Sequence, residues 1–425
     1  MRRAAPTGRT WRASMHFALF TSTYAPEPIG SAVYMADFAR ELVRRGHPTT
    51  VICCYPYYPD WDRSRRKWRF TATIEDGVRV IRVPHTVPSR PNAIGRLGVE
   101  ATYGISSALA TLRLPRFDAA IGAVPALSGG LGAWWAGTLR RKPWGLMVRD
   151  LVSAAALYGG VPGSGPRVAR GVRAVESFLA PRATRVSVIA RGFVAPMLEM
   201  GARQVDFLPN YRTVAQPSLT RDEARRRLGV PEGAFAAVYS GAMGFKQGIL
   251  DLVGAAREAP EAYLLVVGEG SQRVAFQEAV ARAGVTNVRW MPLVPEEEYA
   301  DLLNVADAFL MPQSETGIDM SVPGKLTSYI AMARPIVAAA SPHSETARIV
   351  EESGSGIVVP PASPSAIATA LRELIASPAQ AASHAASAER YAADMLDRDR
   401  GLDRFVEWAL ALAEQREPVA LAPVG

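Results

Sequence analysis

The sequence has few of the residues that bind metal ions or form disulfides. Among its 425 residues there are two cysteines and five histidines. Cys53 and Cys54 are adjacent in an apolar run, so we expect two reduced core residues in a cytoplasmic protein. The histidines lack the spacing of metal ligands, and no Ser-His-Asp order or nucleophile elbow is visible. We therefore expect no metal site and no bound cofactor.

Long apolar runs are missing as well. No stretch of ~18 uninterrupted apolar residues occurs, which argues against a membrane-spanning helix. Residues 1–14 are basic without an apolar run behind them, so we expect an N-terminal extension and not a secretory signal. The hydrophobic fraction of 48% is too high for a disordered chain. At ~100–200 residues per domain, the length predicts two or three domains.

Acidic residues are scarce in one half only. Residues 1–210 carry 29 Lys and Arg against 13 Asp and Glu, whereas residues 211–425 carry 19 against 27. The excess behind the net charge of +8 therefore lies in the first half. Such a half suits nucleic acid, an anionic membrane surface or a phosphorylated substrate. No groove-reading element accompanies the charge, so nucleic acid is not an expected partner.

Short apolar runs alternate with amphipathic segments along the whole chain. In the first half they predict strands over 17–21, 49–54, 117–123, 144–148 and 185–189, with helices between them, one over 30–46. The rhythm stops near 208–210 and restarts, predicting strands over 235–239, 263–267, 288–291, 308–311, 336–339 and 356–359. This is the pattern of an α/β protein with two Rossmann-like, doubly wound parallel-sheet domains facing across a cleft. We place them at residues 15–210 and 211–400, and expect a C-terminal helix within 401–425 to pack back on the first.

Two glycine turns in the second half could lie against phosphate. Residues 238–248 join a strand to a helix, and their glycines would let the backbone approach a phosphate that Lys246 neutralises. The alternative is a flexible loop with a solvated lysine. Residues 266–273 begin like a dinucleotide fingerprint, but Arg273 stands where a third glycine belongs. We interpret them as a tight turn lining a nucleotide cleft.

A polar loop in residues 312–335 leads into a helix that starts near Pro323. Proline at a helix start, followed by Gly324 and Lys325, makes an anion-binding N-terminus. Glu315 and Asp319 could accept hydrogen bonds from sugar hydroxyls, unless they belong to an ordinary loop whose acids face water.

Two loops of the first half are candidates for ligand binding. Residues 21–35 contain Pro26 and Pro28, and Gly30 opens a helix whose free N–H groups could bind an anion or simply form a βα turn. Residues 55–61 read Tyr-Pro-Tyr-Tyr-Pro-Asp-Trp and precede five basic residues in 63–69. These could contact a polar acceptor or a lipid headgroup, or form a solvated surface loop.

Taken together, these segments resemble glycosyltransferase family 4, which has the GT-B fold. Residues 240–248 resemble the family's glycine-and-basic diphosphate loop, and 267–270 its Gly-[Asp/Glu]-Gly turn. Residues 312–317 resemble the loop with its first glutamate, and 329–337 its donor helix and following strand. The resemblance extends over about 15–359.

The first half resembles a narrower group of bacterial polysaccharide transferases, the colanic-acid-type and amino-sugar transferases. Residues 24–30, 45–47 and 55–61 carry this similarity, and 322–326 resemble the group's Val-Pro-Ser-Lys-Leu. Two positions depart from the pattern. The family's second glutamate, which usually holds the ribose, falls at Ser328, and the Trp-Pro expected after Asp150 and Leu151 is absent.

The resemblance implies a retaining, metal-independent glycosyltransferase that uses a nucleotide-diphosphate sugar. Lys246, Lys325 and Glu315 would act in catalysis, the lysines on the diphosphate and the glutamate on the donor sugar. The implied donor-binding residues are Gly241, Gly244, Gly268, Gly270, Met291, Ser321, Val322, Pro323, Gly324 and Ser328. The implied acceptor-binding residues are Gly30, Ser31, Tyr34, Arg149 and Asp150.

Other functions stay open at this point. A sugar-nucleotide epimerase of GT-B type would form product without an added acceptor, and a non-catalytic sugar-nucleotide-binding protein would bind without turnover. The acceptor is either a lipid-linked saccharide or a small molecule of a secondary-metabolite pathway. For the former we expect peripheral contact of the basic first domain with the inner face of the membrane. Residues 93–114 would then be a docking helix, and otherwise a core-facing one.

Overall fold

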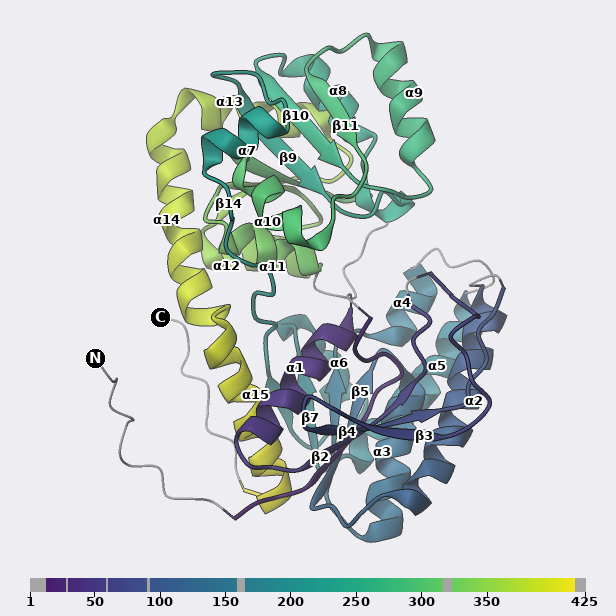
Figure 1. Ribbon diagram of the computed structural model, residues 1–425. Coiled ribbons are helices and arrows are strands. Elements are labelled where there is room, and N and C mark those ends of the chain that lie inside the picture. Colours follow the sequence, from purple (N-terminus) through teal and green to yellow (C-terminus); the bar gives the residue numbers. More distant parts are fainter. Residues whose placement is uncertain are drawn as a thin grey trace, which may run out of the picture.

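The computed structural model describes residues 13–27, 30–58, 60–89, 92–158, 165–315 and 323–416. The chain forms two α/β halves, each built on one sheet with helices on both faces (Figure 1). The predicted pair of doubly wound sheets is thereby confirmed.

The first sheet has eight strands in the order β3-β4-β2-β1-β5-β6-β7-β8, and only the β3–β4 pair is antiparallel. Its strands are β1 (Phe17–Phe20), β2 (Thr49–Cys54), β3 (Thr71–Glu75), β4 (Val78–Val83), β5 (Ala119–Val124), β6 (Trp144–Val148), β7 (Arg185–Val188) and β8 (Val205–Phe207). The central strands are buried along their whole length, which explains why they read as continuous apolar runs.

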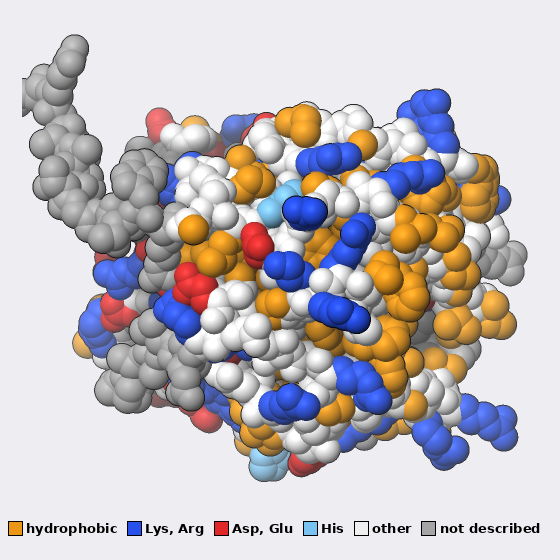
Figure 2. Space-filling view, turned by 90° about the horizontal axis from the view of Figure 1, so that it is seen from below, with side chains coloured by type: hydrophobic (Ala, Val, Ile, Leu, Met, Phe, Trp, Pro, Cys, Tyr) orange, Lys and Arg blue, Asp and Glu red, His pale blue; other side chains and the backbone are white. Residues whose placement is uncertain are grey.

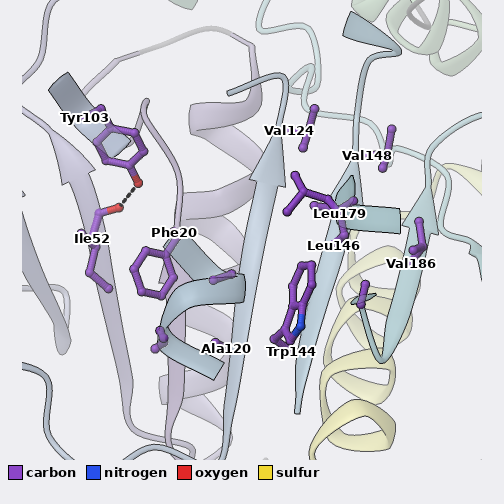
Figure 3. Packing of buried hydrophobic residues seen from close by; sticks show 14 of the residues in the cluster. Phe20, Ile52, Tyr103, Ala120, Val124, Trp144, Leu146, Val148, Leu179 and Val186 are labelled. Atoms are coloured by element: carbon purple, nitrogen blue, oxygen red, sulfur yellow. Dashed lines mark hydrogen bonds between the residues drawn. The ribbon is translucent and has the colours of Figure 1, made fainter. Parts of the chain in front are cut away.

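Helices cover this sheet on both faces. They are α1 (Ser31–Arg44), α2 (Ala93–Ala110), α3 (Leu127–Arg140), α4 (Val152–Tyr158), α5 (Pro166–Leu179) and α6 (Val194–Glu199), together with α15 (Arg398–Glu414). One core lies under α2, α3 and α5, and the other under α1 and α15. Figure 3 shows the first core, in which the Tyr103 hydroxyl of α2 donates to the Ile52 carbonyl oxygen at 2.8 Å. The inner face of α2 is thus fixed to the sheet.

The hairpin of β3 and β4 is not among the predicted strands. Asp76 and Gly77 connect the two strands with φ of +51° and +80°. Positive φ at both central residues is the geometry of a type I′ hairpin turn, for which Asp-Gly is a preferred pair. That dipeptide between alternating residues is the sequence signal that could have found the hairpin.

The second sheet is wholly parallel, with the order β11-β10-β9-β12-β13-β14. Its strands are β9 (Phe235–Ser240), β10 (Ala262–Val267), β11 (Val288–Met291), β12 (Ala308–Pro312), β13 (Ile336–Ala339) and β14 (Gly356–Val359). Its helices are α7 (Arg221–Arg227), α8 (Asp251–Glu258), α9 (Arg273–Ala283), α10 (Glu296–Asn304), α11 (Gly324–Ala331), α12 (Glu345–Ser353), α13 (Pro364–Ala376) and α14 (Pro378–Met395). The predicted strands agree with these to within one residue at each end.

The chain crosses between the halves twice, and the two crossings touch. The Arg212 N–H donates to the Leu396 carbonyl oxygen at 2.8 Å. After the second crossing α15 lies beside α1 on the first sheet, with the Trp408 Nε1–H donating to Asp206 at 3.0 Å. The halves also meet at α12, where Glu345 accepts the N–H of Gly192 at 2.9 Å.

Candidate functional site

The described residues that are expected to bind the donor lie in segments at the carboxyl edge of the second sheet, on the side facing the first half (Figure 1). The chain leaves β9 outward toward β10 and β11, then returns to place β12 on the other side of β9. The boundary between β9 and β12 is therefore the topological switch point, where ligands bind in doubly wound sheets. The first sheet has the equivalent point between β1 and β5, just before α1.

The two glycine turns pack directly on each other. Backbone hydrogen bonds of 2.9 and 2.8 Å join the turn after β9 to the turn after β10. A Cβ at Gly268 would lie 2.2 Å from the Gly241 carbonyl oxygen, and one at Gly270 would lie 2.5 Å from that of Met243. The contact between the turns thus already requires glycine at both positions. Their contact with a donor stays a prediction.

Lys325, in the first turn of α11, lies over the glycine turn of β9. Its Nζ is 4.0 Å from the centroid of the Tyr239 ring and 3.3 Å from the position of a Cβ on Gly241. Burial lowers the pKa of Lys325 to about 7, and within the described residues no carboxylate or hydrogen-bond acceptor offsets that burial. A buried cation without a counter-charge at a switch point is suited to an anionic ligand.

Lys246 and Glu315 come together on neighbouring loops. The turn η4 (Phe245–Gln247) follows Gly244, and the carbonyl oxygen of Lys246 accepts the N–H of Ser314 at 2.9 Å. Burial and then the nearby Glu315 raise the pKa of Asp251, which places these two carboxyl groups close to each other. Glu315 itself is exposed. The loop pair therefore presents one basic and one acidic side chain at the same edge.

The start of α11 completes this edge. Gly324 is its first residue, capped by Pro323, whereas Ser321, Val322 and Asp319 lie outside the described residues. The first N–H groups of a helix have no acceptor within it and attract negative charge. They adjoin Lys325, so the lysine and the helix start offer positive charge at one place.

Two of the expected donor residues make contacts within the protein. Ser328 is 6% exposed, and its hydroxyl faces the Gly324 carbonyl oxygen at 3.5 Å and the Tyr299 side chain. This is a packing position between α10 and α11. Met291 ends β11 half-buried, and its carbonyl oxygen accepts the N–H of Gly268 at 3.0 Å. The structure thus gives both residues structural contacts, and their donor contacts stay predictions.

The expected acceptor residues lie at the start of α1 and the end of β6. Gly30 has φ of +66° and precedes α1 without a side-chain cap. The Ser31 hydroxyl lies 3.1 Å from that of Thr23. Tyr34 is buried one turn further on, and Asp150 follows β6 half-buried. The structure therefore brings residues from both segments to the carboxyl edge of the first sheet.

Arg149 is a buried cation whose hydrogen bonding is incomplete. Its side chain is 5% exposed and its guanidinium stacks 4.2 Å from the centroid of the Tyr34 ring. Nη2 donates to Asn210 at 2.6 Å, whereas Nη1 has no hydrogen-bond partner among the described residues. Burial lowers the pKa of Arg149. Like Lys325, it has the capacity to bind an anionic group.

The two sets of residues meet at α11. The side chain of Thr327 lies beside the Tyr34 hydroxyl, which also donates to the Tyr211 carbonyl oxygen at 3.3 Å. Lys325 and Thr327 are two residues apart on one helix, so they point to different sides of it. α11 therefore connects the cation on the glycine turn with the buried Tyr34–Arg149 pair of the first half.

Tyrosines that sequence reasoning did not single out hold this edge in place. The Tyr329 hydroxyl accepts the N–H of Ser240 at 2.8 Å and lies 3.2 Å from its carbonyl oxygen. The Tyr329 ring stacks on Phe309 at 4.1 Å, and Tyr239 lies beneath Lys325. An aromatic residue within an apolar strand or helix carries no functional signal by itself, so these contacts appear only in the structure.

Within the described stretches, no three His, Cys, Asp or Glu side chains form a group suited to a metal ion. None of the helices in those stretches is both long and apolar enough to cross a membrane.

Comparison with known proteins agrees with this geometry. Residues 30–211 match the family described as "Glycosyl transferase 4-like domain", and residues 234–377 match "Glycosyl transferases group 1". The chain belongs to glycosyltransferase family 4. It is a glycosyltransferase enzyme, and each matched segment contains one of the two sheets.

Two curated relatives illustrate the range of this family. The putative colanic acid biosynthesis glycosyl transferase WcaI of Escherichia coli is 28% identical over 407 residues, covering 92% of this chain and 99% of that protein. The 2-deoxystreptamine N-acetyl-D-glucosaminyltransferase of Streptomyces fradiae is 31% identical over 157 residues, covering 34% of this chain and 37% of that one. The predicted resemblance to colanic-acid-type transferases is confirmed.

Solved structures of low sequence identity share the fold. Sucrose-phosphate synthase from Thermosynechococcus elongatus superposes with a TM-score of 0.73 at 16% identity, covering 94% of this chain and all of that one. HepE from Anabaena, solved with UDP-glucose, gives 0.68 at 14% identity, covering 93% and 100%. The GT-B fold is therefore confirmed for this chain.

Proposed function

We propose that this glycosyltransferase takes a sugar from a nucleotide-diphosphate sugar and transfers it with retention of configuration, without a metal ion. The observation that supports this most is the ammonium of Lys325 at the switch point, which is desolvated and has no counter-charge among the described residues. The diphosphate of the donor would supply that charge. Lys246 would neutralise a second oxygen, and Glu315 would accept hydroxyl groups of the donor sugar.

These groups would act mainly on the leaving group. Negative charge grows on the β-phosphate as the glycosidic bond breaks, and a positioned ammonium with adjoining helix N–H groups stabilises it. In the retaining route the acceptor hydroxyl attacks the same face of the anomeric carbon, and the leaving phosphate takes its proton. Closure of the two halves would exclude water and so limit hydrolysis of the donor.

For the acceptor we propose a saccharide of polysaccharide assembly, held by Tyr34, Arg149 and Asp150. The relative named for colanic acid biosynthesis matches along 92% of this chain, whereas the transferase named for 2-deoxystreptamine matches along 34%. Nη1 of Arg149, which is buried and has no hydrogen-bond partner among the described residues, would bind a negatively charged group on that acceptor. A small aminocyclitol is the alternative that the shorter match favours.

A thermal-shift panel of nucleotide-diphosphate sugars tests the donor assignment. Wild-type protein should be stabilised by one member of the panel, with and without a chelator, because ligand that binds only the folded state raises Tm. Lys325→Met should lose that shift, whereas Lys142→Met, in an exposed position of the first half, should keep it. UDP-glucose is the first member to try.

Product analysis tests the reaction. With the identified donor, sugar should appear on an added saccharide acceptor with the anomeric configuration of the donor, as read by NMR. An altered sugar nucleotide formed without acceptor would instead identify an epimerase. Wild-type turnover by Lys325→Met, or a requirement for a divalent metal, would contradict the proposed mechanism.

A further inference from the structure

The outer face of α2 is a stripe of large aliphatic side chains. The inner face is buried on the sheet through Val99, Tyr103 and Ala110. The outer face carries five aliphatic residues that are each more than half exposed: Ile94 (80%), Leu97 (67%), Ile105 (65%) and Leu109 (53%) on α2, and Leu112 (67%) just after it. Exposed apolar stripes of this kind mark interaction surfaces.

No acidic residue interrupts this stripe. The only charged residues of α2 are Arg96 and Glu100. Glu100 points inward, where it accepts the N–H and the hydroxyl of Ser128 at 2.9 and 2.7 Å. Burial raises its pKa. The acidic residue of the helix therefore lies away from the outer surface. The outer face is apolar, with Arg96 as the charged residue of α2 on the outside.

A basic loop is attached to both ends of the helix. The guanidinium of Arg96 lies 5.3 Å from the ring centroid of Trp61, and that of Arg113 lies 4.5 Å from the ring centroid of Phe70. These two contacts hold the loop of residues 61–70 alongside the stripe. Between them the loop presents Arg63, Arg65, Arg66, Lys67 and Arg69, with Trp68 63% exposed.

We propose that the outer face of α2 and the loop 61–70, together the α2 surface, dock on an anionic phospholipid bilayer. Aliphatic side chains would enter the acyl boundary, Trp68 would lie at the headgroup level, and the arginines and Lys67 would meet lipid phosphates. Figure 2 shows hydrophobic side chains gathered toward the right of the first half, with Lys and Arg among them and acidic groups mostly elsewhere. Basic residues next to exposed aliphatic side chains favour an anionic bilayer over an uncharged protein surface as the binding partner.

The α2 surface is connected to the expected acceptor residues. The loop 55–58 that leads into it is held by Glu27, which accepts the N–H groups of Tyr57 and Tyr58 at 2.9 and 2.8 Å. Glu27 also accepts the N–H of Tyr24, in the turn before α1, at 3.0 Å. Docking would therefore bring the segment that leads to the expected acceptor residues near the bilayer. This goes beyond the proposed transfer reaction, because membrane binding needs no donor and no turnover.

Vesicle co-sedimentation of the full chain tests the proposal. Vesicles of phosphatidylcholine mixed with phosphatidylglycerol should retain the protein at low salt, and binding should weaken at high salt. Vesicles of phosphatidylcholine alone should retain much less. Replacing Leu97 and Ile105 together by Gln should reduce binding at least about tenfold, because two of the five exposed aliphatic side chains then no longer enter the acyl boundary. Reversing Arg65 and Lys67 to Glu should do the same and flatten the salt dependence.

Matched controls separate docking from unfolding and from loss of catalysis. Leu293→Gln and Arg282→Glu alter residues of the second half that are also more than half exposed and should bind vesicles like wild type. Donor-induced thermal shifts should be unchanged in all variants, so failure of docking and failure of the transferase assignment are distinguishable. Wild-type protein that stays in solution with anionic vesicles would overturn the proposal. A dimer in solution that Leu97→Gln with Ile105→Gln dissociates would instead assign the surface to a second copy.

Discussion

The ammonium of Lys325 lies 4.0 Å from the ring centroid of Tyr239, and no described acidic group accompanies it. A ring face offers weak attraction to a cation and replaces little of the water lost on burial. The pKa of Lys325 therefore falls to about 7 in the free protein. Two consequences of this pairing, one for the ligand and one for stability, are measurable.

Donor affinity should depend on pH near neutrality. A nucleotide-diphosphate sugar binds the protonated ammonium better, so its affinity should fall as the pH rises through about 7, and the fall should approach about tenfold per pH unit above that. The phosphates of such a donor keep their charge through this range, so the protein supplies the titrating group. Calorimetric titrations across neutral pH measure the effect. In Lys325→Arg the side chain stays charged across this pH range. If the donor affinity of this variant depended on pH as that of wild type does, the pH dependence would arise from another group.

Lys325→Met should stabilise the ligand-free protein while abolishing its donor response. The folded-state pKa lies below the ordinary value of 10.5, so the unfolded chain binds more protons between about 7 and 10.5. The amount by which Lys325 lowers the free energy of unfolding is therefore greatest below pH 7, and it decreases as the pH rises toward 10.5. At neutral pH we expect Tm to rise by about 2–4 °C, the shift that about 1 kcal/mol produces in a domain of ~150–250 residues. A lower Tm in differential scanning calorimetry would contradict this.

Gly268→Ala should disturb the donor edge through backbone contacts. The new Cβ would lie 2.2 Å from the Gly241 carbonyl oxygen, so the two turns must separate. We expect a loss of about 2 kcal/mol or more in the free energy of unfolding, as for other overpacked sites, and a weaker donor-induced shift. Urea denaturation measures it. Gly171→Ala is the matched control, because its Cβ meets nothing within 4 Å in the middle of α5 and alanine favours a helix.

Arg149→Met should separate donor binding from transfer. The methionine fills similar space but cannot offer Nη1 to an anionic acceptor group. We expect the donor-induced thermal shift to persist and acceptor-dependent release of nucleotide to fall about 100-fold, the effect of ~2.7 kcal/mol in the transition state. Arg116→Met, an exposed arginine of the same half, should leave both readouts unchanged. Loss of donor binding in Arg149→Met would place this residue on the diphosphate instead.

Glu345→Ala should loosen the contact between the halves. The carboxylate accepts the N–H of Gly192, and the neighbouring ion pair of Arg191 with Glu352, at 3.5 Å, is partly exposed and weak. We expect faster hydrogen exchange at residues 190–193 and a larger radius of gyration in solution scattering. Glu351→Ala changes an exposed acid on the same helix and serves as the control. Unchanged exchange at 190–193 would show that other contacts hold the halves.

Strand positions in the second half could be predicted because each of those strands is an apolar run bounded by turn residues. The segment of β3 and β4 could not be recognised by that rule. β3 is largely exposed, and in both strands polar and apolar residues alternate instead of forming a continuous apolar run. The Asp76-Gly77 turn was the stronger local signal. Burial on both faces thus leaves a clear trace in sequence, whereas an edge hairpin depends on turn chemistry.

Motif spacing placed Lys325 at a helix start but could not show what its side chain meets. Its approach to Tyr239 and Gly241 depends on β9 and α11, which are about 80 residues apart in sequence. The same holds for Tyr34 and Thr327, which belong to different halves. Ser328 shows the same limit, because its motif position indicated a donor contact but could not show that its hydroxyl faces the Gly324 carbonyl oxygen and the Tyr299 side chain.

Arg212 and Leu396, which are joined by a backbone hydrogen bond, lie at the two ends of the second α/β half. This half, the inserted body, interrupts the first half in the sequence. Residues between these two crossings form a contiguous unit with its own sheet, whereas the other unit is discontinuous and takes α15 from the far end of the chain. Within it Phe38 of α1 packs against Phe405 of α15, with ring centroids 5.7 Å apart. A fragment cut after residue 210 would expose that face of α1, so separate expression suits the inserted body, while the discontinuous one needs residues 398–414 supplied in trans.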